Sequence, residues 1–293
     1  MTFYQELQLN QAGSKELIRN TQNNKEKFKH IAIYLFKIFL TMIFCMAFVI
    51  GYSKIFGNSN SVVGVVVLLF VLVFRNIDLS IKTSHAIPSL IAIFAILAFG
   101  PRLSNISNIF VELLVNTICI FLLMFLGCHN VKMCNHSTLV LGYLLLYGYD
   151  VSGTLYIKRL EGLAVGIIIT GIIYYVKHRK KEHKSSLSSF IQEFDIKSDR
   201  TKWQLSLTIA ISSILFIARL IHLPRAMWVG IAVMSIISPF PTGKREKAKS
   251  RILGNIFGAL LVFIIFTYCP KFMYENIGIL GGIGVGLSAT YGF

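Results

Sequence analysis

The sequence is poor in charged residues: Asp, Glu, Lys and Arg make up only 14% of its 293 residues, and 55% are hydrophobic. A soluble domain carries about 25% charged residues, so this shortage, which extends along nearly the whole chain, excludes a soluble domain of useful size. Acidic residues are the scarcer kind, 13 against 29 Lys and Arg. The basic residues cluster between apolar segments and form no face with interleaved aromatic residues, which argues against a nucleic-acid partner.

The sequence also lacks the motifs of several kinds of chemistry. It contains no phosphate-binding loop of the form G-x-x-x-x-G-K-[ST], so this chain alone is not expected to pump with ATP. No local motif suggests a Ser-His-Asp triad or a pair of catalytic carboxylates. The glycines from Gly278 to Gly286 lie in an apolar segment and not after a strand, which favours helix packing over dinucleotide binding. We therefore predict a protein that is not an enzyme, with no catalytic residue and no cofactor.

The five cysteines show no spacing that predicts a disulfide framework. Four residues of metal-ligand type lie close together in one short polar segment: Cys128, His129, Cys134 and His136. Their spacing fits none of the usual zinc patterns, and so short a loop could hardly surround a tetrahedral ion. We interpret them as polar residues and reduced thiols, and predict no metal site.

A series of apolar segments fills the chain, several of them long enough to cross about 30 Å of hydrocarbon. The expected membrane spans are Ile31–Tyr52, Val62–Phe74, Ala86–Phe99, Ile109–Gly127, Ser137–Tyr149, Leu160–Val176, Trp203–Ile221, Met227–Phe240, Ile252–Tyr268 and Asn276–Phe293. The links expected between them include Gly100–Ser107, Asp150–Lys158 and the basic loop Lys244–Arg251. The fold prediction is an all-α polytopic membrane protein with about ten transmembrane helices.

The distribution of positive charge predicts the orientation. With the amino terminus in the cytosol, 22 of the 29 Lys and Arg residues would lie inside and the other 7 outside. Positive residues are enriched in cytosolic loops, so both termini are expected to be cytoplasmic in a multi-pass protein of the plasma membrane. No cleaved signal peptide is expected, because the polar segment 1–30 precedes the first apolar run.

The chain resembles itself when it is shifted by 166 residues. Gly64 then falls on Gly230 and Ser84 on Ser250, and the apolar segments coincide. Six spans separate equivalent positions, so the two copies share one orientation and form parallel repeats of six and four helices. The predicted domains are a cytosolic segment 1–30, a six-helix half 31–177, a basic cytosolic linker 178–202 and an incomplete second half 203–293.

Two stretches share an Arg and two glycines at the same spacing. Arg251, Gly254 and Gly258 fall on one face of a helix, beside the polar Asn255. The second stretch, Arg159–Gly166, contains Glu161, Gly162 and Gly166. Glycines on one face let a neighbouring helix approach closely, and an Arg at a span end can reach the interface. A packing face is one interpretation of these stretches and a functional motif is the other.

The stretch RILGNIFGA, Arg251 to Ala259, resembles the R-x-x-G-[T]-x-x-G-A pattern of the fusaric acid resistance and aromatic acid exporter families of bacterial membrane transporters. Arg159 and Gly162 resemble the residues that open the sixth span in those families. Asn255 stands where the families usually have Thr, and His85 and Pro88 stand where the first copy of the motif would have Arg and Gly. The resemblance implies a proton-driven exporter of small, often aromatic, organic acids.

Few ionisable residues lie near membrane depth, where such residues are functional candidates. Glu112 and Glu161 are the candidate proton-linked carboxylates, although Glu161 could instead pair locally with Arg159 or Lys158. Arg219 and Arg225 flank a link between two spans, where they could attract an anionic substrate or anchor the helix ends.

The predicted function is therefore proton-linked export of small organic acids through the membrane. The predicted partners are the lipid bilayer, a small organic anion and a second copy of the chain that would complete the shorter half. The alternative is a non-transporting membrane scaffold or assembly subunit, which glycine-rich faces and few buried charges would fit equally well.

Overall fold

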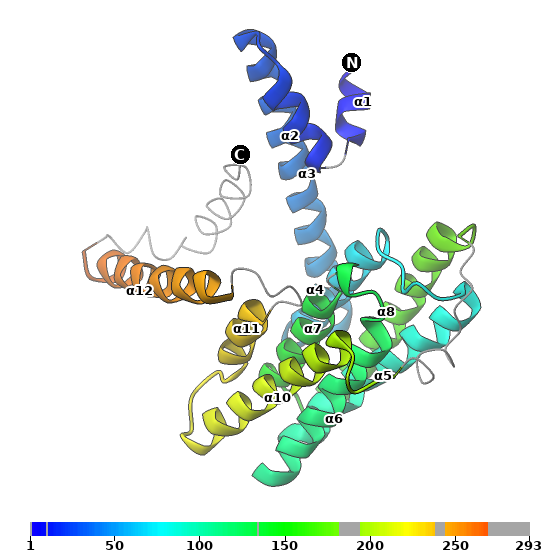
Figure 1. Ribbon diagram of the computed structural model, residues 1–293, viewed down its shortest axis with the longest axis vertical. Helices are drawn as coiled ribbons and strands as arrows, with labels where there is room; N and C mark the ends of the chain where they lie inside the picture. Colours follow the sequence, from blue (N-terminus) through cyan, green and yellow to red (C-terminus); the bar gives the residue numbers. More distant parts are fainter. Residues whose placement is uncertain (1, 10, 134, 182–193, 238–243, 269–293) are drawn as a thin grey trace. The chain divides into compact units, whose positions relative to one another are not determined.

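The computed structural model describes residues 2–9, 11–133, 135–181, 194–237 and 244–268, and within these ranges the regular elements are all helical. The chain is therefore all-α in its described part, as predicted (Figure 1). The α-helices are α1 Phe3–Gln8, α2 Gln11–Asn20, α3 Asn24–Phe56, α4 Ser61–Phe74, α5 Thr83–Ile106, α6 Ile109–Gly127, α7 His136–Gly148, α8 Thr154–His178, α10 Asp199–Leu220, α11 Met227–Ile236 and α12 Lys244–Tyr268.

Among the described residues, five helices are long and apolar enough to cross a membrane: α3, α5, α6, α8 and α10. The helices α4, α7 and α11 have 14, 13 and 10 residues, fewer than the roughly 20 that a straight crossing needs. The structure therefore shows a membrane protein, whereas the count of ten spans stays a prediction. The last expected span, Asn276–Phe293, lies outside the described residues.

The chain divides into two compact units, Met1–Ala47 with Ile252–Phe293, and Phe48–Arg251. In the first unit, α1 and α2 fold back along the beginning of α3. Glu6 is buried, with its Oε1 atom 2.7 Å from Nδ1 of His30, and Lys37 donates to the carbonyl of Leu9. The segment 1–30 thus contains helices anchored on α3.

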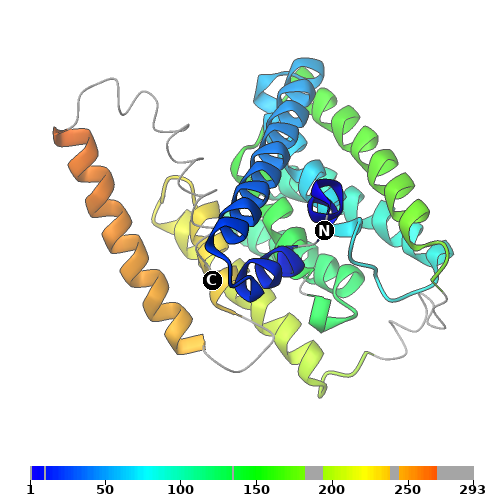
Figure 2. The ribbon, with the colours of Figure 1, turned by 90° about the horizontal axis from the view of Figure 1, so that it is seen from above.

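The unit Phe48–Arg251 is built around α4, a helix with no exposed residue. Its sequence, SVVGVVVLLFVLVF, is apolar on every side, which is typical of a helix that is buried in a core or lies in a membrane. It packs on α7 and α8, while α5 packs on α6, α7 and α8 (Figures 1 and 2). Gly64 lets the end of α3 approach α4, because a Cβ there would lie only 2.8 Å from Cβ of Tyr52.

Helices from both sides of the predicted linker 178–202 share one hydrophobic core. α10 packs on α6, and α11 packs on α7 and α10. The buried side chains of α10 include Trp203, Leu207, Ile211 and Leu215, which belong to the same cluster as those of α4. These contacts bring the end of α10 next to the ends of α6 and α7, where the candidate site lies.

Several predicted boundaries are correct and three predicted links are wrong. α6 has the predicted bounds, since Asn108 caps it by accepting a hydrogen bond from Val111 N–H. The link Gly100–Ser107 is instead the last part of α5, which continues through Gly100 and Pro101. A Pro inside a helix buried among its neighbours is tolerated in membrane proteins. The link Asp150–Lys158 likewise ends early, at the start of α8.

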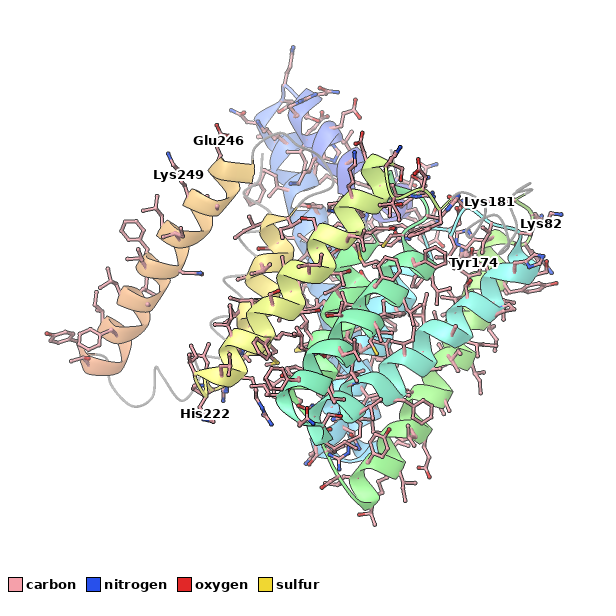
Figure 3. All side chains as sticks on the ribbon, turned by 60° about the horizontal axis from the view of Figure 1, so that its bottom comes forward. Lys82, Tyr174, Lys181, His222, Glu246 and Lys249 are labelled. Atoms are coloured by element: carbon pink, nitrogen blue, oxygen red, sulfur yellow. The ribbon has the colours of Figure 1, made fainter. Side chains whose placement is uncertain are left out.

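The basic loop Lys244–Arg251 is also helical, because α12 begins at Lys244. Glu246 and Lys249 lie near its beginning (Figure 3), where a run of Lys and Arg has high helix propensity.

One pair of helix starts agrees with the predicted repeat of 166 residues. α4 begins at Ser61 and α11 begins at Met227, 166 positions later, and the repeat itself remains a prediction.

Candidate functional site

A polar pocket of about 270 Å³ opens at one end of the unit Phe48–Arg251, where α7, α10 and α11 meet. Figure 3 shows His222, one of its lining residues, at this end of the unit. The pocket is lined by Asn105, Tyr147, Gly148, Ala218, Arg219, His222, Leu223, Arg225, Ala226 and Met227. Both predicted halves, 31–177 and 203–293, contribute to it. Transporters built from repeats bind their substrates between the repeats, so this is the first candidate for a substrate site.

A strained turn between α10 and α11 forms one edge of the pocket. The N–H of Leu223 donates to the carbonyl of Ala218 (2.8 Å) and the N–H of His222 to that of Arg219 (3.1 Å), the two bonds of a Schellman turn. Such a turn needs a left-handed residue, usually glycine, and here it is His222 with φ 52°. Arg225 follows with φ 58°. A side chain in this conformation costs about 1–2 kcal/mol, and such strain tends to occur at functional sites.

A buried carboxylate lies beside the pocket. Glu112, near the start of α6, is only 2% exposed. The hydroxyl of Tyr147 donates to its Oε1 atom at 2.5 Å. The other oxygen, Oε2, accepts no hydrogen bond from the described residues and lies 3.5 Å from Nε of Arg219. The Arg219 side chain is 51% exposed and also lines the pocket, so it is shared between the pocket and Glu112.

A second pair of hydrogen-bonded polar residues, Asn116 and Tyr143, lies one helical turn further along the same two helices, α6 and α7. Asn116 follows Glu112 by four residues on α6, as Tyr143 precedes Tyr147 by four residues on α7, so each pair lies on one helix face. Oδ1 of Asn116 accepts hydrogen bonds from Tyr143 (2.8 Å) and from Ser104 (2.9 Å). Both pairs, Glu112 with Tyr147 and Asn116 with Tyr143, are buried. Buried polar networks of this kind fix one arrangement of the helices.

Side chains from α5 and α8 hold the end of α7, and with it Tyr147. The last carbonyls of a helix have no partner inside the helix. Asn105 donates to the carbonyl of Tyr147 at 2.9 Å. Arg159 donates to the carbonyls of Leu146 (3.3 Å) and Tyr149. A cation at this position also opposes the negative end of the helix dipole. The tyrosine is thereby fixed between the pocket and Glu112.

The predicted motif Arg159–Gly166 is a packing element in this structure. Arg159 is only 2% exposed and also donates to Oδ1 of Asn60 at 3.3 Å. Glu161 is exposed, and none of these hydrogen bonds of Arg159 goes to it. Gly162 and Gly166 are buried. A Cβ at Gly162 would press on side chains of α3 and α4, and one at Gly166 on side chains of α4 and α5. The two glycines let α8 approach α4 closely.

The other predicted motif lies on α12, outside the pocket. A Cβ added at Gly254 or Gly258 would meet no atom within 4 Å, and Asn255 is exposed. The side chain of Arg251 is outside the part of the chain that the structure describes. The described residues therefore make no close contact at this glycine face, and its packing role stays a prediction.

The described residues of metal-ligand type do not gather into one cluster. A guanidinium nitrogen of Arg200 lies 3.1 Å from Nδ1 of His129. The ring of His136 packs edge-on against Trp203, with centroids 4.9 Å apart. Cys134 lies outside the described residues. Among the residues that the structure describes, no group of three His, Cys, Asp or Glu side chains could hold a metal ion.

The structure brings together three residues that the sequence suggested separately: Glu112, Arg219 and Arg225. Tyr147, Asn105 and His222 were not predicted as site residues. A signal for Tyr147 exists in the sequence, because Tyr143 and Tyr147 repeat the spacing of Glu112 and Asn116. Their pairing across α6 and α7 depends on tertiary contacts that this spacing alone does not specify.

Comparison with known families gives a match in the last third of the chain. Residues 209–292 match the family model described as fusaric acid resistance protein-like, which confirms the resemblance predicted from Arg251–Ala259. The matched region includes Arg219, His222 and Arg225, and thus the α10–α11 side of the pocket. Comparison with curated proteins and with solved structures finds no match.

Proposed function

We propose that this chain, with its fusaric acid resistance protein-like region at residues 209–292, is a membrane transporter that carries small organic anions in a proton-linked manner. The family match and the five apolar helices indicate a membrane transporter. The observation that carries the finer proposal is the position of Arg219. Its guanidinium borders the pocket and lies 3.5 Å from the buried carboxylate of Glu112.

The lining of the pocket suits a small carboxylate. Arg219 and Arg225 supply guanidinium groups, which bind carboxylates through two parallel hydrogen bonds. No acidic side chain lies among the described residues that line the pocket. Tyr147, Leu223 and Met227 add apolar surface for the rest of the molecule. The volume of about 270 Å³ is near the lower limit for ligand pockets, roughly 300 Å³, which favours small acids such as substituted benzoates.

Competition for Arg219 would link the anion to a proton. A substrate carboxylate that binds Arg219 removes the cation from Oε2 of Glu112. A buried carboxylate without its counter-charge is costly and takes up a proton more readily. Conversely, a protonated Glu112 releases Arg219 for the substrate. Anion binding and proton binding therefore assist each other, which couples the anion and the proton in the same direction. Export as the net direction rests on the family resemblance alone.

The proposed orientation places both termini in the cytoplasm, as the distribution of positive charge indicates. The proposed partners are the lipid bilayer, the organic anion and a second copy of the chain. The scaffold alternative predicts no substrate site between the halves, and the pocket beside Arg219 argues against it.

A tolerance assay in cells tests the proposal. Cells that produce the protein should grow at higher concentrations of at least one acid from a panel of aromatic carboxylates than cells without it. Arg219→Ala should abolish this tolerance, whereas Arg75→Ala, which removes an exposed Arg outside the pocket, should retain it. Equal tolerance with and without the protein across the whole panel would contradict the proposal.

A further inference from the structure

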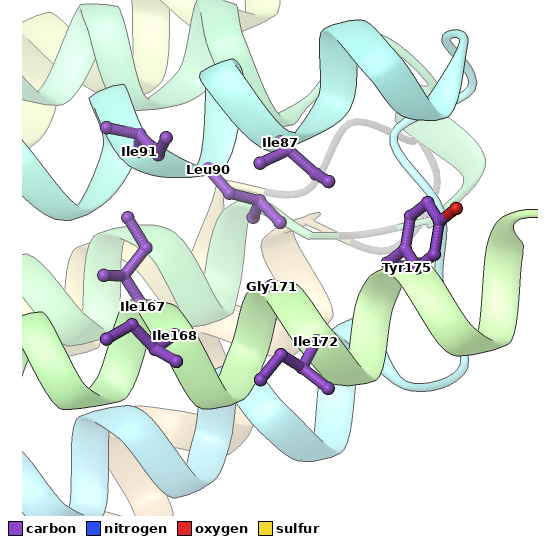
Figure 4. A pocket seen from close by; sticks show the side chains of 8 residues that line it. All are labelled: Ile87, Leu90, Ile91, Ile167, Ile168, Gly171, Ile172 and Tyr175. Atoms are coloured by element: carbon purple, nitrogen blue, oxygen red, sulfur yellow. The ribbon is translucent and has the colours of Figure 1, made fainter.

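An apolar groove of about 410 Å³ runs between α5 and α8 (Figure 4). Both helices are long and apolar enough to span the membrane, so the groove faces hydrocarbon. Its lining is formed by Ile87, Leu90, Ile91, Ile167, Ile168, Gly171, Ile172 and Tyr175. Figure 4 shows the isoleucines of the two helices facing each other across it, with Tyr175 at one end.

Gly171 leaves the groove open. On the same helix, a Cβ at Gly162 or Gly166 would press on side chains of α4, but a Cβ at Gly171 would meet no atom within 4 Å. Gly171 is therefore not needed for packing within the described chain. The side chains of Ile168 and Ile172 remain 60% and 59% exposed beside it. The groove is thus bordered by apolar side chains and has room for a ligand.

The Tyr175 end of the groove carries positive charge. The hydroxyl of Thr83, at the start of α5, donates to the carbonyl of His178, at the end of α8, at 3.4 Å. This contact holds the start of α5 and the end of α8 together. Lys82, which precedes Thr83, and Arg179, which follows His178, therefore lie at the same end of the groove. Both side chains are exposed, and Figure 3 shows Lys82 beside Lys181 and Tyr174.

The neighbouring acidic residue does not cancel this charge. Asp78 is bound by Lys181, whose Nζ lies 2.8 Å from its Oδ2. Lys177 and Lys180 add two more exposed cations on the last turn of α8 and just after it. A surface of several Lys and Arg at the membrane boundary attracts anionic lipid, by about 1 kcal/mol for each residue.

We propose that this groove binds an anionic phospholipid. The acyl chain lies along Ile91, Ile168 and Ile172 over Gly171, and the phosphate binds Lys82 and Arg179 with the hydroxyl of Tyr175 beside it. An apolar channel that ends in cations matches a ligand that is apolar along its length and anionic at one end. A neutral lipid satisfies only the first feature and a free anion only the second. The proposal does not depend on the transport function.

Native mass spectrometry of the full chain released from nanodiscs tests the groove. The discs contain equal amounts of phosphatidylglycerol and phosphatidylcholine, and the lipids retained by each chain are counted. The wild type should retain phosphatidylglycerol in preference to phosphatidylcholine. Gly171→Phe should fill the groove and lower this retention severalfold. The matched control is Gly51→Phe on α3, where a Cβ also meets no atom within 4 Å, and it should behave as the wild type.

A second variant pair tests the cationic end without touching the groove. Lys82→Glu and Arg179→Glu should each lower the preference for phosphatidylglycerol by about fivefold. Lys158→Glu, an exposed residue near the other end of α8, should leave it unchanged. Equal retention of the two lipids by the wild type, or equal retention by Gly171→Phe and Gly51→Phe, would overturn the proposal. A wild-type dimer that Gly171→Phe converts into monomers would also overturn it, because the groove would then hold a second chain.

Discussion

The hydroxyl of Tyr147 lies 2.5 Å from Oε1 of Glu112, across the interface of α6 and α7. This contact links the polar pocket to a carboxylate that is almost completely buried. It is the only hydrogen bond that the Glu112 side chain accepts among the described residues, and Arg219 supplies the opposing charge. A carboxylate held by one hydrogen bond and one exposed cation responds to whatever approaches that cation.

Tyr147→Phe tests this contact. The substitution leaves a buried carboxylate without its hydrogen-bond donor, which should lower the free energy of unfolding by about 1–3 kcal/mol. Thermal unfolding in detergent measures the effect. Tyr149→Phe is the matched control, because that side chain is exposed and should change stability little. Equal unfolding temperatures for Tyr147→Phe and the wild type would show that the contact contributes nothing.

Arg159→Ala should destabilise the protein more than any exposed basic residue does. It removes hydrogen bonds to the carbonyls of Leu146 and Tyr149 and to Asn60, and leaves these buried acceptors without partners. A loss of about 2–3 kcal/mol is expected. Chemical or thermal unfolding of Lys158→Ala, the exposed neighbour, provides the comparison. If the two variants unfold alike, Arg159 does not hold the end of α7.

His222→Gly should stabilise the protein by about 0.5–1 kcal/mol, because glycine adopts a positive φ without strain. His222→Ala keeps a Cβ and should give no such gain. The same unfolding measurement distinguishes them. If strain at this turn shapes the pocket, His222→Gly should also weaken anion binding. Destabilisation by glycine would show that the φ of His222 carries no strain.

Gly254→Leu and Gly258→Leu test whether the glycine face of α12 packs on a partner chain. A Cβ added at either position meets no described atom within 4 Å. If a second copy packs there, both variants should reduce the dimer fraction seen by crosslinking in membranes. Gly171→Leu is a control, since it also projects into open space on another helix. An unchanged dimer fraction would exclude this face as the interface.

The helix bounds could be predicted where apolar segments end at strong local signals. α6 lies between the capping residue Asn108 and the polar Cys128 segment, and its predicted bounds are correct. The end of α5 was predicted wrongly because Gly100 and Pro101 are typical of a break. Tertiary packing decides this case, since Gly100 is pressed against Cys119 and Tyr143 and the helix continues.

The candidate site was predictable in its components but not in its assembly. Glu112, Arg219 and Arg225 were identified because ionisable residues are rare near membrane depth. Their association depends on the packing of α10 against α6, which periodicity and composition do not determine. The partners of Arg159 could not be predicted for the same reason, because they lie at positions 60, 146 and 149 and not at the nearby Glu161.

The most direct test of the account is the pH dependence of anion binding in the Glu112→Gln variant. Gln has the shape of a protonated Glu and leaves Arg219 free. Affinity for a small aromatic carboxylate, measured by calorimetry, should rise in the wild type as the pH falls from neutral to acidic. In Glu112→Gln it should be high at both, whereas Glu161→Gln should behave as the wild type. His222→Gln, measured beside them, separates protonation of the imidazole in the pocket from protonation of Glu112. Wild-type pH dependence in Glu112→Gln would contradict the coupling of proton and anion through Arg219.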